Sequence, residues 1–219
     1  MGFDIAFVLA ALPDVGAASL INAWMAIIIC LFALATGIGL TLVRSLKIRA
    51  INAVVDIFIS FVRGTPILIQ IFLCYYVLPL VGLDLNPTTA GIVAISLNSG
   101  VFITENFRGA LSALDDGPIE AATALALTPA MIWYLVILPQ LLRRTLPMLV
   151  SEGTVILKNT ALLSVITVTE GFRVAQQIGG ATFRPFEPLI AVAICFLALN
   201  LILVGFGNLL ERRNAAIVR

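Results

Sequence analysis

The sequence predicts an all-α integral membrane protein, and its composition and its charge-free stretches carry this prediction. Of the 219 residues, 61% are hydrophobic and only 11% are charged, which leaves too little polar surface for a soluble domain. Five stretches contain no Asp, Glu, Lys or Arg: 15–43, 64–83, 85–104, 121–142 and 188–210. About 20 apolar residues cross a bilayer as a helix. The strands of a membrane barrel would alternate apolar and polar residues, which these stretches do not.

The composition also argues against several kinds of function. The net charge of +1 gives no reason to expect a nucleic-acid partner. The chain has no His, which removes the commonest general base and the commonest metal ligand. Its three Cys lie inside apolar stretches without metal-ligand spacing. We therefore expect no metal, no cofactor and no catalytic residue on this chain, and a membrane-embedded enzyme is the weakest alternative.

The distribution of charge predicts the orientation in the membrane. The segment 44–49 carries three cations and no anion, and the tail after residue 210 carries three arginines and one glutamate. The N-terminal segment holds only Asp4 and Asp14, and the connection 81–86 holds only Asp84. By the positive-inside rule the C-terminus is cytoplasmic and the N-terminus lies outside, so the number of spans is odd. No cation precedes Arg44, so we expect the first span to insert as its own anchor.

Five spans are expected, at 18–43, 51–80, 87–108, 145–169 and 187–210. Hydropathy alone would place the fourth at 121–142, but Arg143 and Arg144 follow that stretch and belong inside. We therefore start this span near Thr145, although it then encloses Glu152 and Lys158. The expected organisation is an outer segment 1–17, a membrane domain 18–213 and a cytoplasmic tail 214–219.

A short helix is predicted between the third and fourth spans. Asp116 or Gly117 can cap it, and Pro118 is tolerated in its first turn. Glu120 also falls in that turn, where the helix dipole favours an anion. Thr128-Pro129 ends this helix of about three turns and starts another. The alternative is an ordinary apolar run that enters a membrane span.

This segment resembles the EAA motif of the permeases of type I ABC importers. That motif reads Glu-Ala-Ala, three residues, Gly, nine residues, Ile, one residue, Leu-Pro. The residues at the motif positions are Glu120, Ala121, Ala122, Ala126, Val136, Leu138 and Pro139, with Val136 in place of the Ile and Ala126 in place of the Gly. Ala126 stands where the motif has Gly, so we expect the backbone there to avoid conformations open only to Gly.

Further blocks extend the resemblance from about residue 18 to 213. They are 61–66 followed by Tyr75-Tyr76, 104–110, 156–162 and 210–213. Their order and spacing are similar to the polar amino-acid branch of the family, the permeases for histidine, arginine, glutamine, glutamate or opines.

The resemblance implies a five-helix permease subunit in the bacterial inner membrane. The region 112–130 would hold a coupling helix that seats in a cytoplasmic ABC ATPase dimer, with the residues Gly117, Glu120, Ala121, Ala122, Ala126 and Pro129. A second permease chain, identical or similar, would complete the path, and a periplasmic or extracellular binding protein would deliver the amino acid. ATP and Mg would be bound by the ATPase, because this chain has no G-x-x-x-x-G-K-[ST] phosphate loop.

Two cations inside expected spans are candidate path residues. Arg63 and Lys158 would each cost about 2.5–3.5 kcal/mol at a helix centre. The sequence Arg63-Gly64-Thr65-Pro66 predicts a helix break that frees backbone groups and a cation for a substrate carboxylate. The alternative is a polar patch of Asp56 and Arg63 near the cytoplasmic interface.

Lys158 is placed along the path together with Thr160 and Ser164. The alternative is an ion pair of Lys158 with Glu152, which needs a bend because the two are six residues apart.

Other polar and small residues are given structural roles. Glu105 and Arg108, three residues apart, are expected to pair, although Glu105 or Glu152 can also offer a counter-charge to a substrate. Glu170 has no clear partner in the sequence. Two glycine pairs, Gly37 with Gly39 and Gly205 with Gly207, predict close packing between spans.

The alternative from another functional class is a stand-alone secondary transporter or channel driven by an ion gradient. It would use Asp56, Glu105 or Glu152 as ion or proton sites. Uptake that survives ATP depletion and collapses without an ion gradient would distinguish it from the ATP-driven importer.

Overall fold

The computed structural model describes residues 3–217, with side chains described to residue 213, and within that range every regular element is a helix. The ends of the predicted outer segment and cytoplasmic tail, 1–2 and 218–219, lie outside the described residues. The elements are α1 (Ile5–Ser45), α2 (Arg49–Gly64), α3 (Ile67–Phe72), α4 (Pro87–Leu111), α5 (Gly117–Ala124), α6 (Pro129–Ile132), α7 (Leu138–Asn159), α8 (Gly171–Thr182) and α9 (Phe186–Ile217).

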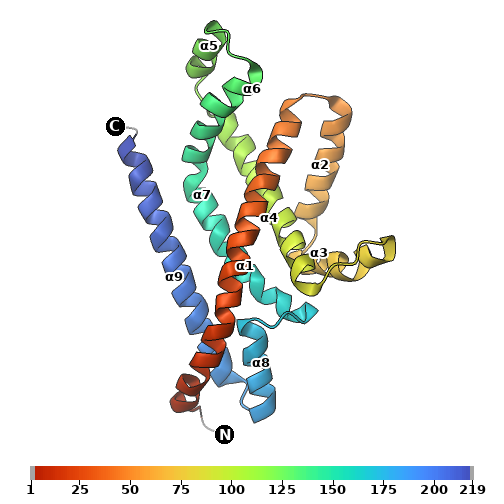
Figure 1. Cartoon of the computed structure of the whole chain (residues 1–219), viewed down its shortest axis with the longest axis vertical. Coiled ribbons are helices and arrows are strands. Elements are labelled where there is room, and N and C mark those ends of the chain that lie inside the picture. Colours follow the sequence, from red (N-terminus) through yellow and green to blue (C-terminus); the bar gives the residue numbers. More distant parts are fainter. Residues whose placement is uncertain (1–2, 218–219) are drawn as a thin grey trace.

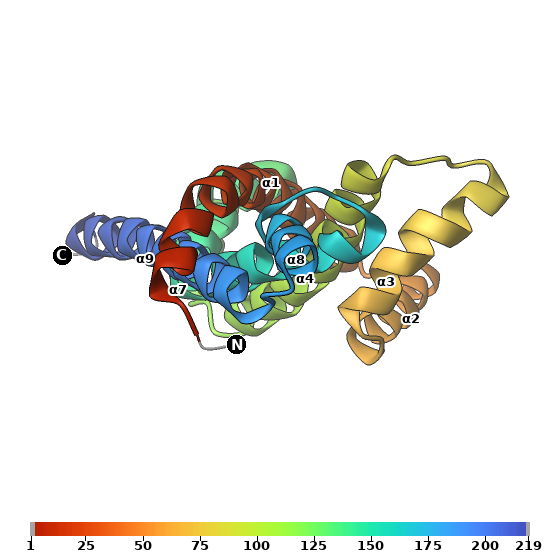
Figure 2. The same cartoon turned by 90° about the horizontal axis from the view of Figure 1, so that it is seen from below.

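The long helices lie side by side along the longest axis of the molecule (Figure 1). The α1–α2 connection, α5 and the end of α9 lie toward one end, and the N-terminus and α8 lie toward the other (Figure 1). The arm formed by α2 and α3 projects to one side of the other helices (Figure 2). The two termini are therefore at opposite ends, as an odd number of spans requires.

Among the described residues, four helical segments are long and apolar enough to span a membrane: Ile5–Ser45, Pro87–Leu111, Pro129–Ile166 and Phe186–Arg213. The bent pair Arg49–Gly64 and Ile67–Val81 makes a fifth if it is counted as one span. The bend between its two parts is 112°. The prediction of an all-helical membrane chain is therefore confirmed, and the number of spans is five when the bent pair is counted as one.

The first helix starts earlier than predicted. It begins at Ile5 instead of residue 18, and the Asp4 carboxylate caps it by accepting from the Ala6 N–H at 2.9 Å. The first turn is also attached to the connection between α8 and α9. The Arg184 guanidinium lies 3.1 Å from the Asp4 carboxylate and 5.2 Å from the centre of the Phe7 ring. The hydrogen bond to Arg184 lowers the pKa of Asp4.

The helix that contains the fourth predicted span begins well before the predicted span start near Thr145. Helix continues without a break from Pro129 through Ile166, and Arg143 and Arg144 lie exposed within it. A segment of this length reaches well beyond the roughly 20 residues that a bilayer needs, so the two cations can project near the α5 end. The positive-inside rule predicts where the membrane begins, whereas backbone hydrogen bonding determines that the helix begins at Pro129.

Single π turns accommodate two prolines that would otherwise interrupt the helices. The π turn Leu73–Val77 comes just before Pro79, and the π turn Trp133–Ile137 comes just before Pro139. A proline has no N–H to donate to the carbonyl four residues earlier. The wider turn shifts the hydrogen bonds, so that Leu78 bonds to Leu73 and Leu138 bonds to Trp133. The helix therefore continues past Pro139.

The centre of the core is the contact between α1 and α4, where two glycines let the backbones approach. A Cβ added to Gly37 would lie 2.4 Å from the Ile103 side chain, and one added to Gly100 would lie 2.6 Å from Thr36. Gly39 faces open space. Likewise Gly207 packs against Val150.

Gly205, like Gly39, faces open space. The predicted packing role is therefore confirmed for one member of each glycine pair. Residues two apart on a helix point to nearly opposite sides, so both members cannot face the same neighbour.

This packing predicts different effects of two matched substitutions. Gly37→Val forces a side chain into the buried Ile103 and should lower the free energy of unfolding by about 1–3 kcal/mol through overpacking. Gly39→Val places the same side chain in open space and should leave stability almost unchanged. Unfolding of the purified chain in mixed micelles measures the difference. Equal effects of the two variants would contradict the assigned packing.

Candidate functional site

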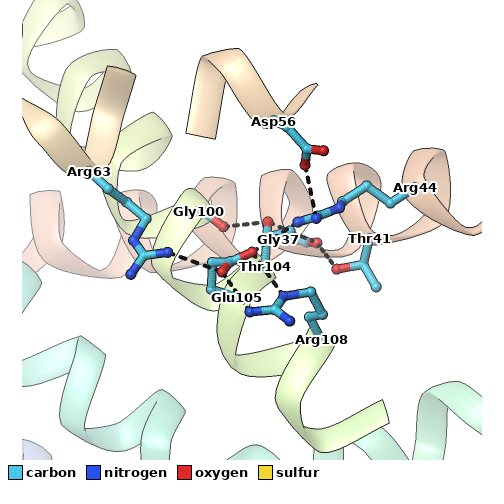
Figure 3. A network of polar contacts seen from close by, with 9 residues as sticks. All are labelled: Gly37, Thr41, Arg44, Asp56, Arg63, Gly100, Thr104, Glu105 and Arg108. Carbon is cyan, nitrogen blue, oxygen red and sulfur yellow. Dashed lines mark hydrogen bonds and ion pairs between the residues drawn. The ribbon is translucent and has the colours of Figure 1, made fainter. Parts of the chain in front are cut away.

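Five charged residues form an ion cluster where α1, α2 and α4 meet: Arg44, Asp56, Arg63, Glu105 and Arg108 (Figure 3). Glu105 is its centre, with oxygens 2.8 Å from Arg44, 3.1 Å from Arg63 and 3.1 Å from Arg108. Arg44 also reaches Asp56 at 2.9 Å. Three cations therefore share two carboxylates.

The ion cluster confirms one predicted ion pair and one predicted polar patch. Glu105 pairs with Arg108, and Asp56 and Arg63 belong to one polar patch, although they touch through Arg44 and Glu105 and not directly. Arg44 joins them from α1, a contact that no local pattern in the sequence indicated.

The ion cluster adds charge pairing to a small apolar contact between α2 and the rest of the protein. Val55, Ile59 and Val62 on α2 bury their side chains together with Val101 on α4. The Arg63–Glu105 pair joins the same two helices, and the Arg44–Asp56 pair joins α2 to α1. The attachment of α2 therefore depends on Glu105, whose side chain is only 17% exposed.

The predicted break in the second span is present. Thr65 and Pro66 are extended, with ψ of 142° and 139°, and separate α2 from α3. The cation beside the break is not free, because Arg63 pairs with Glu105. The carbonyls of Val62 and Thr65 accept hydrogen bonds from the Gln70 side chain. The cation and two of the carbonyls that were predicted to be free for a substrate are therefore already bound by Glu105 and Gln70.

The remaining predicted path residues do not form one cluster in this conformation. Lys158 is exposed, whereas Thr160 and Ser164 are buried. The structure shows no ion pair between Lys158 and Glu152, so the predicted alternative for these two residues is wrong. The two residues lie on the regular helix α7 without the bend that such a pair would need.

Glu152 instead lines a small cavity between α1, α4 and α7. Most of the other residues that line this cavity are apolar: Cys30, Leu34, Ile103, Leu149 and Ile156. The side chain is half-buried and lies near the buried hydroxyl of Ser99. A carboxylate in apolar surroundings without a cation is costly, and a bound cationic group would reduce that cost.

Glu170 has partners, contrary to the expectation from the sequence. It is fully buried and accepts hydrogen bonds from Asn22 at 2.9 Å and from the N–H groups of Phe172 and Arg173 at 2.8 and 2.9 Å. Asn22 also donates to Thr160 at 2.8 Å. This network joins α1, the start of α8 and the end of the α7 segment.

Sequence reasoning missed α8, although Glu170 followed by Gly171 is a possible helix start. Asn22 is a polar side chain in the apolar stretch 15–43, and this could have indicated a hydrogen bond to another helix.

The short helix α5 is present, with two of its details different from the prediction. It has eight residues, about two turns instead of three. Asp116 is the N-cap residue, one of the two predicted positions, but its side chain makes no cap hydrogen bond. The Asp115 carboxylate instead accepts from the Gly117 N–H at 3.2 Å. Glu120 lies exposed in the first turn, and the next helix begins at Pro129 with a cap from Thr128.

The expectation for the backbone of Ala126 is wrong. Its φ is 55°, in the left-handed region that favours Gly. The reason is the way in which α5 ends. The Leu127 N–H bonds to the Ala122 carbonyl at 3.2 Å, which needs a left-handed residue between them. Closing the helix end in this way outweighs the cost of the Ala126 conformation.

The segments before and after α5 are tied together by one arginine. The Arg144 guanidinium on α7 donates to the carbonyl of Ala113, in the connection between α4 and α5. This contact spans 31 residues of sequence. The connection before α5 is therefore held against α7, in the helical segment that follows α5.

Substitution of Ala126 tests the backbone conformation at the end of α5. Ala126→Gly removes the cost of a left-handed Ala and should stabilise the helix end by about 1 kcal/mol. Ala121→Gly, in the middle of the same helix, should weaken α5 by about 1 kcal/mol. Hydrogen exchange of the α5 amides should slow in the first variant and accelerate in the second. Faster exchange in both would contradict the assigned conformation.

Two neutralising substitutions test the central place of Glu105. Glu105→Gln leaves Arg44, Arg63 and Arg108 around a neutral amide and should lower the free energy of unfolding by about 2 kcal/mol. Asp56→Asn removes one more exposed pair and should cost less than about 1 kcal/mol. The comparison uses denaturant titration in mixed micelles. An equal or larger cost for Asp56→Asn would contradict the central role of Glu105.

Comparison with known proteins places the fold and sequence in a family. The family described as binding-protein-dependent transport system inner membrane component matches residues 34–215. The chain is 35% identical over 215 residues to the glutamine transport system permease protein GlnP of Escherichia coli, covering 97% of this chain and 98% of that protein. It is 31% identical to the arginine transport system permease protein ArtQ of Bacillus subtilis, covering 97% and 98% of the two chains.

Solved structures show the same fold. A crystal structure of an amino acid ABC transporter with histidines matches with a TM-score of 0.86 and 31% identity, covering 97% of this chain and 100% of that chain. The MetNI methionine ABC transporter in an inward-facing conformation matches with a TM-score of 0.63 at 19% identity, over 95% of this chain and 96% of that chain, and shows the fold alone. This chain therefore belongs to the family of inner-membrane components of binding-protein-dependent transport systems, the permease subunits of ABC transporters.

Proposed function

We propose that the chain is the permease subunit of an ATP-driven importer of polar amino acids, and that α5 couples it to a separate ATPase. The observation that carries this proposal is α5 itself. It is a short capped helix at one end of the molecule, with non-helical connections on both sides and Glu120 exposed in its first turn. A helix of two turns cannot span a bilayer, but it can dock into a groove of another protein.

The connections of α5 suggest how movement would pass into the membrane. The connection before α5 follows directly from α4, and the connection after it leads into the long helical segment that starts at Pro129. Because Arg144 on α7 also bonds to the connection between α4 and α5, a displacement of α5 would move both helices at once. Residues Gly117, Glu120, Ala121, Ala122, Ala126 and Pro129 form or bound this docking helix.

ATP and Mg are assigned to the partner ATPase dimer, and the permease path to this chain together with a second permease chain. In this proposal α5 and the end of α9 face the cytoplasm. The cation-rich segment 44–49 lies toward the same end of the molecule, which supports this orientation. The N-terminus and α8 would face outward, where a binding protein delivers the solute.

The substrate class follows from the relatives and from the available charges. Relatives are named as glutamine and arginine permeases, and a similar transporter is described with histidines. Of the two carboxylates expected to meet a substrate cation, Glu105 already pairs with three arginines. Glu152 has no ion pair in the structure, so we assign it the counter-charge for a cationic or polar amino acid.

The segment from Arg63 to Pro66 and the residues Lys158, Thr160 and Ser164 are proposed to border the path. Lys158 is exposed in this conformation. Thr160 and Ser164 are buried and would need a rearrangement of the Asn22 contact to reach a solute.

Charge reversal on α5 tests the coupling role. Glu120→Lys should reduce ATP-dependent uptake by more than tenfold in the reconstituted complex, because an exposed anion in the docking helix becomes a cation. Insertion of the chain into the membrane should be unchanged, because the Glu120 side chain is exposed. Uptake of radiolabelled arginine and glutamine into proteoliposomes with internal ATP measures the effect.

The control for this test is Glu211→Lys, a charge reversal near the end of α9. It should leave uptake within about twofold of the unmodified complex, because Glu211 lies outside α5. Full uptake by the Glu120→Lys complex would contradict the coupling role. Uptake that continues without ATP and stops without an ion gradient would favour a secondary transporter.

A further inference from the structure

The break between α2 and α3 leaves backbone acceptors without their normal donors. In a continuous helix the Val62 carbonyl would accept from residue 66, but Pro66 has no N–H. The Thr65 carbonyl would accept from Ile69, whose N–H bonds to Pro66 instead, at 3.0 Å. An unpaired carbonyl among apolar helices costs several kcal/mol in a membrane. The break can persist only if another group supplies the missing hydrogen bonds.

Gln70 supplies them. Its side-chain amide nitrogen lies 2.8 Å from the Val62 carbonyl oxygen and 3.1 Å from the Thr65 carbonyl oxygen, and also 3.0 Å from the Thr65 hydroxyl. The Thr65 hydroxyl in turn donates to the Phe61 carbonyl at 2.9 Å. Gln70 is only 6% exposed, so its amide does not have water as an alternative partner. One buried side chain thus replaces the helix bonds that the proline removes.

The other end of the same amide is fixed to α4. The Gln70 side-chain oxygen accepts from the Asn98 amide at 3.1 Å, and Asn98 is 7% exposed. The orientation of the Gln70 amide follows from its partners, because only its NH₂ group can satisfy the two carbonyls. The break is therefore joined to α4 by a hydrogen bond between two buried side chains.

A second contact joins the same two regions on the same face of α4. Asn98 and Glu105 are seven residues apart, which is about two helical turns. Glu105 holds Arg63, which lies next to Val62 at the end of α2. The end of α2 and the break are thus fixed to one side of α4 at two positions. From there α4 continues as an uninterrupted helix to Leu111 and the connection to α5.

We propose that Gln70 is a positioning residue for transport, which holds the break between α2 and α3 to α4 and so transmits the movement of α4 to this part of the path. This inference rests on the proposed coupling through α5. The bend of 112° is then a fixed joint and not a flexible hinge. Gln70 acts on the backbone of the break and on Asn98, and no contact of Gln70 with the solute is needed.

The test compares uptake with ATP hydrolysis in the complete complex of permease, ATPase and binding protein in proteoliposomes. Gln70→Leu keeps the approximate size of the side chain and removes all its hydrogen bonds. It should lower uptake at least tenfold while ATP hydrolysis stays within about threefold, so that the amount of arginine or glutamine transported per ATP falls. Gln177→Leu is the matched control, because Gln177 is exposed on α8 and makes no side-chain hydrogen bond among the described residues.

A second variant separates the joint from general stability. Asn98→Ala removes the tie to α4 and leaves the Val62 and Thr65 carbonyls with their donor. It should also lower the amount transported per ATP, and the double variant with Gln70→Leu should be no worse than Gln70→Leu alone. If Gln70→Leu does not assemble, Asn98→Ala decides the question.

An unchanged ratio of uptake to ATP hydrolysis in Gln70→Leu or Asn98→Ala would overturn the inference. The proposed function is judged separately, by Glu120→Lys in the same assay. Loss of uptake in Glu120→Lys together with a normal ratio in Gln70→Leu would refute the role of Gln70 alone.

Discussion

The structure depends on one constraint, which is that polar groups among apolar helices must find their partners inside the protein. The break after α2 is tolerated because the Gln70 amide bonds to the carbonyls that Pro66 leaves without donors. The buried Glu170 is tolerated because Asn22 and the first N–H groups of α8 surround it. Glu105 is tolerated because three arginines share it. Each of these groups also joins helices that are distant in sequence.

The helix α4 connects most of these features. Its contact with α1 is close because Gly37 and Gly100 carry no side chains, and the ion cluster lies beside that contact (Figure 3). Asn98 and Glu105 on its surface hold the break and the end of α2. Its C-terminal end leads directly to α5. In the proposed mechanism α4 is therefore the element that carries movement of the docking helix toward the solute path.

The sequence predicted what depends on local chemistry. Apolar length indicated the spans, Pro118 and Pro129 marked the start of α5 and of the helix after it, and the Arg63–Pro66 segment marked the break. It did not predict contacts between distant residues, such as Asn22 with Glu170, which are 148 positions apart.

The errors have physical causes. The positive-inside rule places cations relative to the membrane and not helix ends, so it did not indicate that the helix starting at Pro129 continues through the predicted boundary at Thr145. At Ala126 the hydrogen bonds that close α5 override the conformational preference of the residue. The roles assigned to Glu152 and the other proposed path residues remain predictions, because they depend on a second permease chain and a solute.

The central claim is that α5 docks against a separate ATPase. The most direct measurement places a photo-crosslinking amino acid at Thr123, which is exposed on α5. The control position is Leu80, which is exposed near the end of the second part of the bent span, Ile67–Val81. In membranes that contain the complete transporter, the account predicts covalent capture of the ATPase from Thr123 and none from Leu80. Failure of the Thr123 position to capture the ATPase in a complex that transports normally would contradict the account.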